Sequence, residues 1–420
     1  MSHAAAAKVY LIGAGPGDPA LMTLRGADLL AQADLVLYDY LVNPRLLERA
    51  RPDAEVVCLG RHGAGRIVPQ DEIHQRMIDG ARSGRLVVRL KGGDPAIFGR
   101  TAEEVAALEA AGVPYEIVPG VTAALAASSY AGIPLTHRDA ASCVALVTGR
   151  QCSQPDGARL DMAGLAGVPG TLAFYMGVTT AAEWATELVA HGKPADTPVA
   201  VIRHATLPQQ TVQRTTLSAL PEFVVAHRLR PPAVVLVGEV VTRQASVAWF
   251  AARPLAGQCV LVPRPRRQIE PLAGALEALG ARVLVQPAIE IGPPADWGPV
   301  DAALDRLAEY QWVVFSSANG VDALLHRLIA TGRDARAFGP ARLAAIGPAT
   351  VDALATWRLR ADLQPDEYRA EALADALAPH AMGQRVLLVR ASRGRETLRE
   401  MLETCGCQVD QAVAYESRDV

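Results

Sequence analysis

Short apolar runs alternate with stretches of helical spacing along the first 140 residues. Continuous apolar runs separated by amphipathic segments are typical of strands in a mostly parallel sheet that helices cover on both faces. The predicted strands are 8–13, 35–38, 55–60, 86–90 and 115–118. The predicted helices between them are 21–32, 70–83 and 101–111.

The same alternation continues to the end of the chain in two further blocks. The second block has predicted strands at 143–148, 171–175, 199–202 and 234–237. The third begins near residue 259, with predicted strands at 260–262, 282–286, 312–315, 343–346 and 385–389 and helices at 300–309 and 370–377. We therefore expect an α/β protein with units over 8–138, 139–251 and 258–420.

Composition limits the possible partners. The chain has 420 residues, enough for two to four domains of roughly 100–200 residues each. The net charge is −3, from 41 basic and 44 acidic residues, so the chain lacks the excess of positive charge that is typical of nucleic-acid-binding proteins. No apolar run reaches the ~18 residues that span a bilayer, and the N-terminus lacks an apolar signal segment.

The cysteines and other reactive residues give no sign of a metal centre or a catalytic triad. The six cysteines are scattered without a CxxC pair, which favours a reduced, cytoplasmic protein. Cys405 and Cys407 would supply only two metal ligands and have no histidine nearby in the sequence. We therefore expect them to pack in the protein interior. The chain has no HExxH motif and no Ser, His and Asp in triad order.

Three segments place glycines, a proline and polar groups where a predicted strand ends. They are GAGPGDP at 13–19, VRLKGGDPAIFGR at 88–100 and PGVTAALAASSYAGIPLTHRD at 119–139. Glycine permits the tight, left-handed turns that let a backbone approach a ligand. Three such loops in one part of the chain predict one shared cleft.

The residues 8–250 resemble the uroporphyrinogen-III C-methyltransferase family. The motifs occur in the family order: GAGPGDPALMTL, LVLYD, GGDPAIFGR, AGIPLTHRD, VTG and FYMG. The resemblance implies the two-domain tetrapyrrole methylase fold, with S-adenosyl-L-methionine held between the domains. It also implies methylation of uroporphyrinogen III, an anionic tetrapyrrole, to precorrin-2 for sirohaem and cobalamin, by a homodimer.

The family's catalytic residues map onto two positions. Asp39, in LYD, matches the proposed proton acceptor. Arg61 stands where the family has the lysine proposed as proton donor. Arginine is effectively always protonated, so we interpret Arg61 as an electrostatic anchor for substrate carboxylates, and water or His62 remains an alternative donor.

Nine positions match the family's cofactor contacts. They are Pro16, Gly92, Gly93, Asp94, Ile97, Thr122, Ala123, Met176 and Ala205. We expect Asp94 to accept from the cofactor ammonium group. Ala205 replaces a family glycine, so that contact would use backbone atoms. Basic candidates for substrate binding near these loops are Arg61, His62, Arg66, Lys91, Arg100, His137 and Arg138.

The third block resembles uroporphyrinogen-III synthase. The matching segments are VLVPRPR, PAIEI, FSSANGV, AIGPAT, PDEYRAEALADAL and VLLVRASRGRETL. The family builds two lobes, and here 415–417 resembles the returning crossover, so the first lobe would consist of an opening strand and helix. We expect little or no synthase activity. Candidate contacts, for which a structural role is the simpler interpretation, are Arg264, Ser317, Asn319, Tyr368 and Arg390.

Three other functions remain open. GAGPGDP after a strand imitates a dinucleotide loop, and Asp39 imitates its acidic residue, which suggests a nucleotide-dependent oxidoreductase, although the glycine spacing differs. Arg61 and the incomplete synthase lobe suggest a non-catalytic tetrapyrrole-binding or channelling protein. A sister methylase acting on another precorrin or on diphthine is the third.

Overall fold

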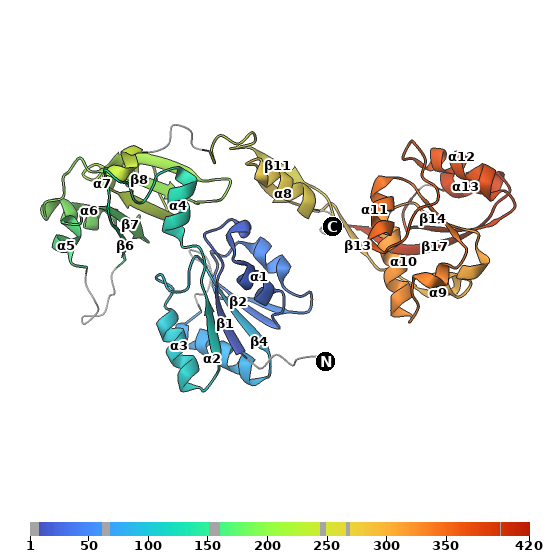
Figure 1. The fold of residues 1–420 in the computed structure, drawn as a ribbon, viewed down its shortest axis with the longest axis horizontal. Coiled ribbons are helices and arrows are strands. Elements are labelled where there is room, and N and C mark those ends of the chain that lie inside the picture. Colours follow the sequence, from blue (N-terminus) through green and yellow to red (C-terminus); the bar gives the residue numbers. More distant parts are fainter. Residues whose placement is uncertain (1–7, 61–67, 151–159, 244–248, 266–268, 395) are drawn as a thin grey trace. The chain divides into compact units, whose positions relative to one another are not determined.

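The computed structural model describes residues 8–60, 68–150, 160–243, 249–265, 269–394 and 396–420. Contacts divide the chain into two compact units. The first comprises Met1–Val260 with Leu276–Arg282, and the second comprises Leu261–Ala275 with Val283–Val420 (Figure 1). Among the described residues, no helix has the length and apolar character needed to cross a bilayer.

The first unit opens with a five-stranded parallel sheet. Its strands lie in the order β3 (Glu55–Cys58), β2 (Leu35–Tyr38), β4 (Leu86–Lys91), β1 (Lys8–Gly13) and β5 (Tyr115–Val118). The helices that connect them are α1 (Leu24–Leu30), α2 (Gln70–Arg82) and α3 (Thr101–Ala110). The predicted strands and the parallel sheet are confirmed.

Side-chain alternation along β1 explains the two cores of this sheet. Val9 and Leu11 point to the face that packs against Met77 of α2. Ile12 points to the other face and packs against Leu30 of α1. Burial on both faces is the physical reason for the continuous apolar runs in the sequence.

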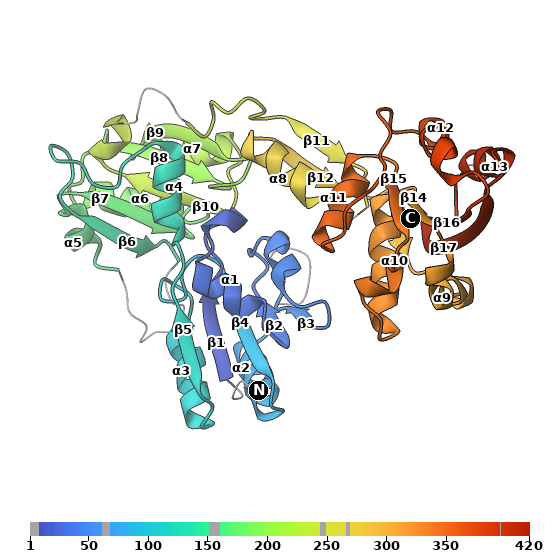
Figure 2. The same ribbon diagram turned by 45° about the vertical axis from the view of Figure 1, so that its right-hand side comes forward.

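A second five-stranded sheet follows in the same unit (Figure 2). Its order is β6 (Val144–Thr148), β7 (Thr171–Tyr175), β10 (Ala233–Val237), β8 (Pro198–Arg203) and β9 (Thr211–Thr216). Only β6 and β7 pair in parallel, and the other pairs are antiparallel. The helices α4 (Ala123–Ala131), α5 (Met162–Ala166), α6 (Ala181–Ala190) and α7 (Leu220–Ala226) accompany it.

Neither the helices of this part nor β9 were predicted from the sequence. β9 is a polar edge strand, TVQRTT, and gives no apolar signal. α4 lies inside the 119–139 motif and is built of small residues. Ala124, Ala127 and Ala131 pack against the second sheet, so α4 links the glycine loops to that sheet.

The chain then forms a small strand–helix–strand segment, β11 (Cys259–Val262), α8 (Glu270–Ala278) and β12 (Arg282–Val285). β11 pairs with β12 in a two-stranded sheet. Hydrogen bonds flank this pairing: Arg282 N donates to Gln258 O, and Gln286 N donates to Val262 O. The expectation that the first lobe consists of one strand and one helix is therefore wrong.

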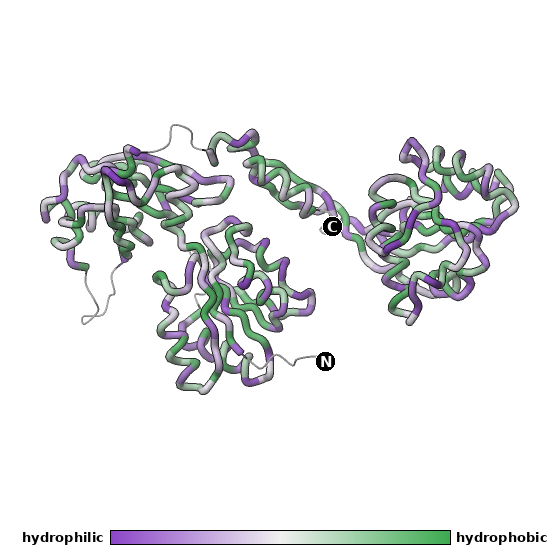
Figure 3. Tube along the Cα trace, viewed as in Figure 1, coloured by the Kyte–Doolittle hydropathy of each residue, from purple (hydrophilic) through white to green (hydrophobic). Residues whose placement is uncertain are grey.

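The second unit is dominated by another five-stranded sheet. Its order is β13 (Ile289–Gly292), β17 (Gln408–Asp419), β16 (Arg385–Ala391), β14 (Trp312–Phe315) and β15 (Arg342–Ala345). The helices are α9 (Gly298–Asp305), α10 (Ala318–Ala330), α11 (Pro348–Thr356), α12 (Ala370–Ala381) and α13 (Thr397–Thr404). Figure 3 shows hydrophobic residues concentrated along the inner strands.

β17 changes partner along its length. It pairs in parallel with β16 as far as Tyr415, and from Glu416 onward it pairs antiparallel with β13. β13 and β17 were not predicted: β13 has only four residues, IEIG, and β17 mixes polar and apolar residues throughout. The change of partner falls at 415–417, where the synthase resemblance places a crossover.

Candidate cofactor and substrate site

The carboxyl ends of β1, β4 and β5 meet at one edge of the first sheet. The loops that follow pack backbone to backbone: a Cβ added to Gly13 would lie 2.6 Å from Gly120 Cα and 2.7 Å from Gly93 O. Gly15 and Gly93 also exchange two hydrogen bonds, of 3.2 and 2.8 Å. The structure thus brings the three glycine motifs together. Ligands of open α/β sheets bind at this edge.

The loop after β4 leaves room beside its glycines. Gly93 has φ +70°, and a Cβ there would lie 3.8 Å from both Thr122 Cα and Ala123 N. Gly92 is exposed, with only Leu41 within 4 Å of an added Cβ. An added side chain would therefore fill the space between this loop and the start of α4. That space suits the backbone contacts of a bound cofactor.

Asp94 ties two of the loops together. Its Oδ1 accepts a hydrogen bond from Ala96 N at 2.8 Å, and its Oδ2 accepts one from Gly120 N at 2.9 Å. Each oxygen keeps a second lone pair. The carboxylate therefore shapes the loop first, and an ammonium contact would be additional to that role. Ile97, just behind, is half-buried.

Tyr175 connects the start of α4 to the second sheet. Its hydroxyl lies 2.8 Å from Thr122 Oγ1 and accepts from Ala124 N at 3.0 Å. The ring of Phe98 lies 5.1 Å from its ring, between centroids. Burial raises the pKa of Tyr175. Thr122 and Ala123, two predicted cofactor contacts, are thereby fixed beside Gly93.

Strained backbone gathers in the loops of this site. Among the described residues, seven non-glycine residues have a left-handed φ, and five lie here: Phe98, Arg100, Met176, His204 and Thr206. Such strain persists where function requires the geometry. Met176, at φ 52°, leaves 47% of its surface exposed directly after β7. An apolar side chain held exposed in this way suits a contact with a ligand.

The loop after β8 closes onto the first glycine motif. Asp18 N donates to Thr206 Oγ1 at 2.9 Å, and Tyr130 OH donates to Asp18 Oδ2 at 3.1 Å. Burial, and then the nearby Asp18, raise the pKa of Tyr130 to about 12. Pro16 and Ala205, both half-buried, are thus brought to the same group of loops.

Asp39 follows β2 directly and is held by a buried arginine. Its backbone N donates to Leu90 O at 3.1 Å, and its Oδ1 accepts from Arg89 Nη2 at 2.6 Å. The Asp39 side chain is 36% exposed, whereas that of Arg89 is 5% exposed. A partly exposed carboxylate with one fixed oxygen can accept a proton from a ligand at this edge of the sheet.

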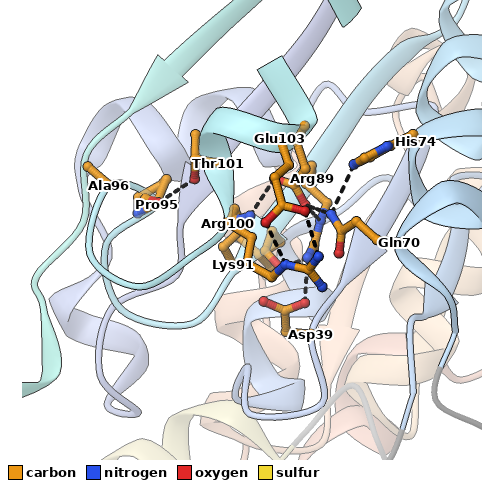
Figure 4. A network of polar contacts seen from close by, with 12 residues as sticks. Asp39, Gln70, His74, Arg89, Lys91, Pro95, Ala96, Arg100, Thr101 and Glu103 are labelled. Atoms are coloured by element: carbon orange, nitrogen blue, oxygen red, sulfur yellow. Dashed lines mark hydrogen bonds and ion pairs between the residues drawn. The ribbon is translucent and has the colours of Figure 1, made fainter. Parts of the chain in front are cut away.

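Arg89 belongs to a larger buried network (Figure 4). Its Nε donates to Glu104 Oε1 at 3.0 Å, while Lys91 Nζ donates to Glu104 Oε2. Burial, then Arg89, lowers the pKa of Lys91. Burial alone would lower the pKa of Arg89, but Asp39 and Glu104 together raise it.

The basic candidates for substrate binding fall in different places. Arg61, His62 and Arg66 lie outside the described residues. The interpretation of Lys91 as a substrate contact is wrong, because its side chain is 2% exposed and forms an ion pair with Glu104. Arg100 is exposed and forms an ion pair with Glu103.

The remaining two basic candidates lie together in the loop after α4. His137 Nδ1 accepts from Asp139 N at 3.2 Å, and Arg138 is exposed. Both therefore stay close to the chain's surface.

Sequence reasoning missed three site residues, Arg89, Glu104 and Tyr175. A signal existed for Arg89, since RLK places two cations inside a strand that is otherwise apolar. Such cations need a buried carboxylate. The sequence does not reveal that Glu104, and not its neighbour Glu103, supplies it.

The candidates of the synthase-like region have structural contacts. Ser317 Oγ caps α10 by accepting from Gly320 N at 3.1 Å, and it lies 2.9 Å from Tyr415 OH. Arg390 is 8% exposed and forms an ion pair with Glu396. The other candidates are Arg264 and Tyr368, which are exposed, and Asn319 on α10.

Comparisons with known proteins give a family match for each of the two regions. The family model "Tetrapyrrole (Corrin/Porphyrin) Methylases" matches residues 8–221, and the model "Uroporphyrinogen-III synthase HemD" matches residues 270–420. A siroheme synthase of Zymomonas mobilis is 48% identical over 59% of this chain and 51% of its own length. The chain thus spans about half the length of the siroheme synthases it matches.

Two further relatives cover different shares of the chain. The porphyrin biosynthesis protein HemD of Ruminiclostridium josui is 33% identical over 97% of this chain and 81% of its own length. A solved cobalt precorrin-4 methyltransferase is 34% identical over 57% of this chain and 98% of that one, with a TM-score of 0.51. Because the methylase model matches half of the chain, and the Ruminiclostridium relative aligns with nearly all of it, the chain belongs to the tetrapyrrole (corrin/porphyrin) methylase family.

Proposed function

We propose that this chain is a uroporphyrinogen-III C-methyltransferase that uses S-adenosyl-L-methionine and forms precorrin-2, the precursor of sirohaem and cobalamin. The observation that carries the proposal is the meeting of the three glycine loops at the carboxyl ends of β1, β4 and β5. There, Gly93 leaves room that faces Thr122 and Ala123 at the start of α4, and Met176, strained and exposed, directly follows Tyr175, which contacts Thr122. The family of the chain supports the same activity.

The cofactor site fits the chain's own residues. Gly92 and Gly93 offer backbone groups without side chains, and Thr122 and Ala123 face Gly93 from α4. Met176 offers an apolar wall, and Pro16, Asp94, Ile97 and Ala205 shape the surrounding loops. When bound, S-adenosyl-L-methionine supplies a methyl group activated by its positive sulfur.

The protein has two further tasks, orientation and proton removal. Methylation makes a ring carbon tetrahedral, so the macrocycle must lose a proton. Asp39 is the proposed acceptor, because its carboxylate is partly exposed at the sheet edge and is held by Arg89. Arg61 and the exposed Arg100 and Arg138 are the proposed partners of substrate carboxylates, which arginine binds bidentately.

The proposal includes the domain boundaries and the oligomeric state. We assign the methylase to two subdomains, 8–138 and 139–251, and the synthase-like region to 258–420. We assign a homodimer as the active species, to be measured by sedimentation equilibrium.

Mass spectrometry of the tetrapyrrole tests the activity. Uroporphyrinogen III is incubated with the protein and S-adenosyl-L-methionine, and the expected product has gained two methyl groups. No mass gain, with folded protein that binds the cofactor by calorimetry, would leave a tetrapyrrole-binding protein. Thermal stabilisation by NAD without stabilisation by S-adenosyl-L-methionine would instead point to an oxidoreductase.

A further inference from the structure

One fully buried carboxylate lies between the proposed base and the cofactor loop. The Glu104 side chain is 0% exposed, in the first turn of α3, where the helix dipole favours a negative charge. Its Oε1 accepts from Arg89, and its Oε2 accepts from Lys91. Gln70 of α2 donates to Oε1 at 3.5 Å and contacts His74 at 3.1 Å.

The two cations point to the same face because they are two residues apart on β4. Away from this polar cluster the face is apolar and includes Leu37, Met77 and Leu108. A buried ion pair is weak evidence for stability, since apolar residues of similar volume often stabilise as well or better. The charges at the carboxyl end of an otherwise apolar face therefore call for a role in the site.

Each cation leads to a different part of the site. Arg89 reaches Asp39 Oδ1 through Nη2. Lys91 directly precedes Gly92, and its Cε would lie 3.1 Å from a Cβ added to Gly99 at the other end of the same loop. Thr101 Oγ1, just beyond, donates to Pro95 O inside that loop.

We propose that Glu104 is a positioning residue for methyl transfer, which sets the Asp39 carboxylate through Arg89 and the 92–99 loop through Lys91. The proposal rests on the proposed function, because Asp39 and that loop matter only if they serve the methyl transfer. One carboxylate then fixes the position of the proposed base relative to the loop that would hold the methyl donor. Such positioning matters because misplacement of reacting groups by about 1 Å lowers rates by about 10²-fold.

The contacts through Arg89 and through Lys91 predict different kinetic defects. Arg89→Met removes the contact to Asp39 and one of the two ion pairs of Glu104, but leaves Lys91 paired with Glu104. We therefore expect kcat to fall about 10²-fold while the Kd of S-adenosyl-L-methionine stays within about threefold. Lys91→Met removes the support of the loop and the other ion pair of Glu104, but leaves Arg89 bound to Asp39 and Glu104. We therefore expect this Kd to rise about tenfold with a smaller change in kcat. Glu104→Gln keeps the shape of the side chain, loses its charge, and shows both defects together.

Glu109→Gln is the matched control. Glu109 lies on the same helix, is exposed, and accepts from Tyr115 OH at 2.7 Å. It should keep wild-type kcat and Kd. Glu104→Asp, which keeps the charge on a shorter side chain, should recover part of the kcat lost in Glu104→Gln, whereas a purely structural role would change melting temperature without this split.

The experiment combines calorimetric Kd values, product mass spectrometry and thermal melting on the full chain. If Glu104→Gln does not fold, the charge-balanced Glu104→Gln/Lys91→Met variant takes its place, with the same expected loss of cofactor affinity. Wild-type protein that methylates, together with folded Glu104 variants that match Glu109→Gln, overturns this inference alone. Wild-type protein that does not methylate overturns the proposed function.

Discussion

The hydroxyl of Tyr175 and Oγ1 of Thr122 lie 2.8 Å apart, although 53 positions separate the two residues in the chain. Tyr175 ends β7 of the second sheet, and Thr122 begins α4 beside the glycine loops of the first. The contact therefore joins the two sheets of the first unit at the cofactor site.

Removing this hydroxyl should weaken cofactor binding. Tyr175→Phe leaves Thr122 Oγ1 and Ala124 N without their partner, at a cost of about 1–3 kcal/mol. We expect a lower melting temperature and a roughly tenfold higher Kd for S-adenosyl-L-methionine by calorimetry. Tyr115→Phe, which removes an exposed hydroxyl bonded to Glu109, is the control. Equal Kd values for the two variants would contradict the role of Tyr175.

Gly93→Val should block cofactor binding. The added branches enter the space facing Thr122 and Ala123, and φ +70° is unfavourable for a β-branched residue. Gly112→Val is the matched control, because Gly112 has φ +67° but nothing within 4 Å of its added Cβ. Both variants should lose similar stability, whereas only Gly93→Val should lose affinity in calorimetry. Unchanged affinity in folded Gly93→Val would refute the assignment of the loop.

Asp39→Asn should lose turnover and keep the cofactor. The role of a base is worth about 10²–10⁴-fold in rate. Asp34→Asn, at the opposite end of β2, removes a comparable carboxylate that pairs with Arg51 at 2.9 Å. This control should lower the melting temperature and leave kcat unchanged. If product mass spectrometry gives Asp39→Asn nearly the wild-type rate, Asp39 only shapes the turn after β2.

Tyr310 predicts how the second unit responds to alkali. Burial, then its hydrogen bond of 2.7 Å to Asp410 Oδ2, raise its pKa to about 12 from the usual value of 10.0. The folded state then holds the phenol proton more tightly than the unfolded state, so this stabilisation is complete below pH 10 and decreases toward pH 12. Chemical unfolding of Tyr310→Phe across this range should show a smaller decrease than wild type. An equal decrease would exclude Tyr310 as the cause.

The β11–β12 sheet should open more readily than the five-stranded sheet that contains β14. A two-stranded sheet is marginal in water, and Leu261, Leu284 and Val285 leave 58%, 42% and 43% of their surface exposed. In contrast, every residue of β14 is buried. Native-state hydrogen exchange should therefore be much faster for β11 and β12 amides than for β14 amides. Equal protection would show that another surface covers this segment.

The order of elements could be predicted because the hydrophobic signal is local. The strands 35–38, 115–118 and 171–175 match β2, β5 and β7, since each is an apolar run between turn residues. The glycine motifs likewise marked the carboxyl edge of the first sheet, because parallel strands place their ends together. β9 and β17 escaped prediction because polar strands are specified by their pairing partners, which lie elsewhere in the chain.

The chemistry of the site depended on contacts that no local pattern encodes. The sequence by itself determined the fold class, the glycine loops and Asp39 as a candidate base. Only the tertiary structure decided that Arg89, 50 positions away, holds Asp39, and that Glu104 balances Arg89 and Lys91. The physical reason is that a buried cation requires a carboxylate nearby in space, and folding selects which carboxylate meets it.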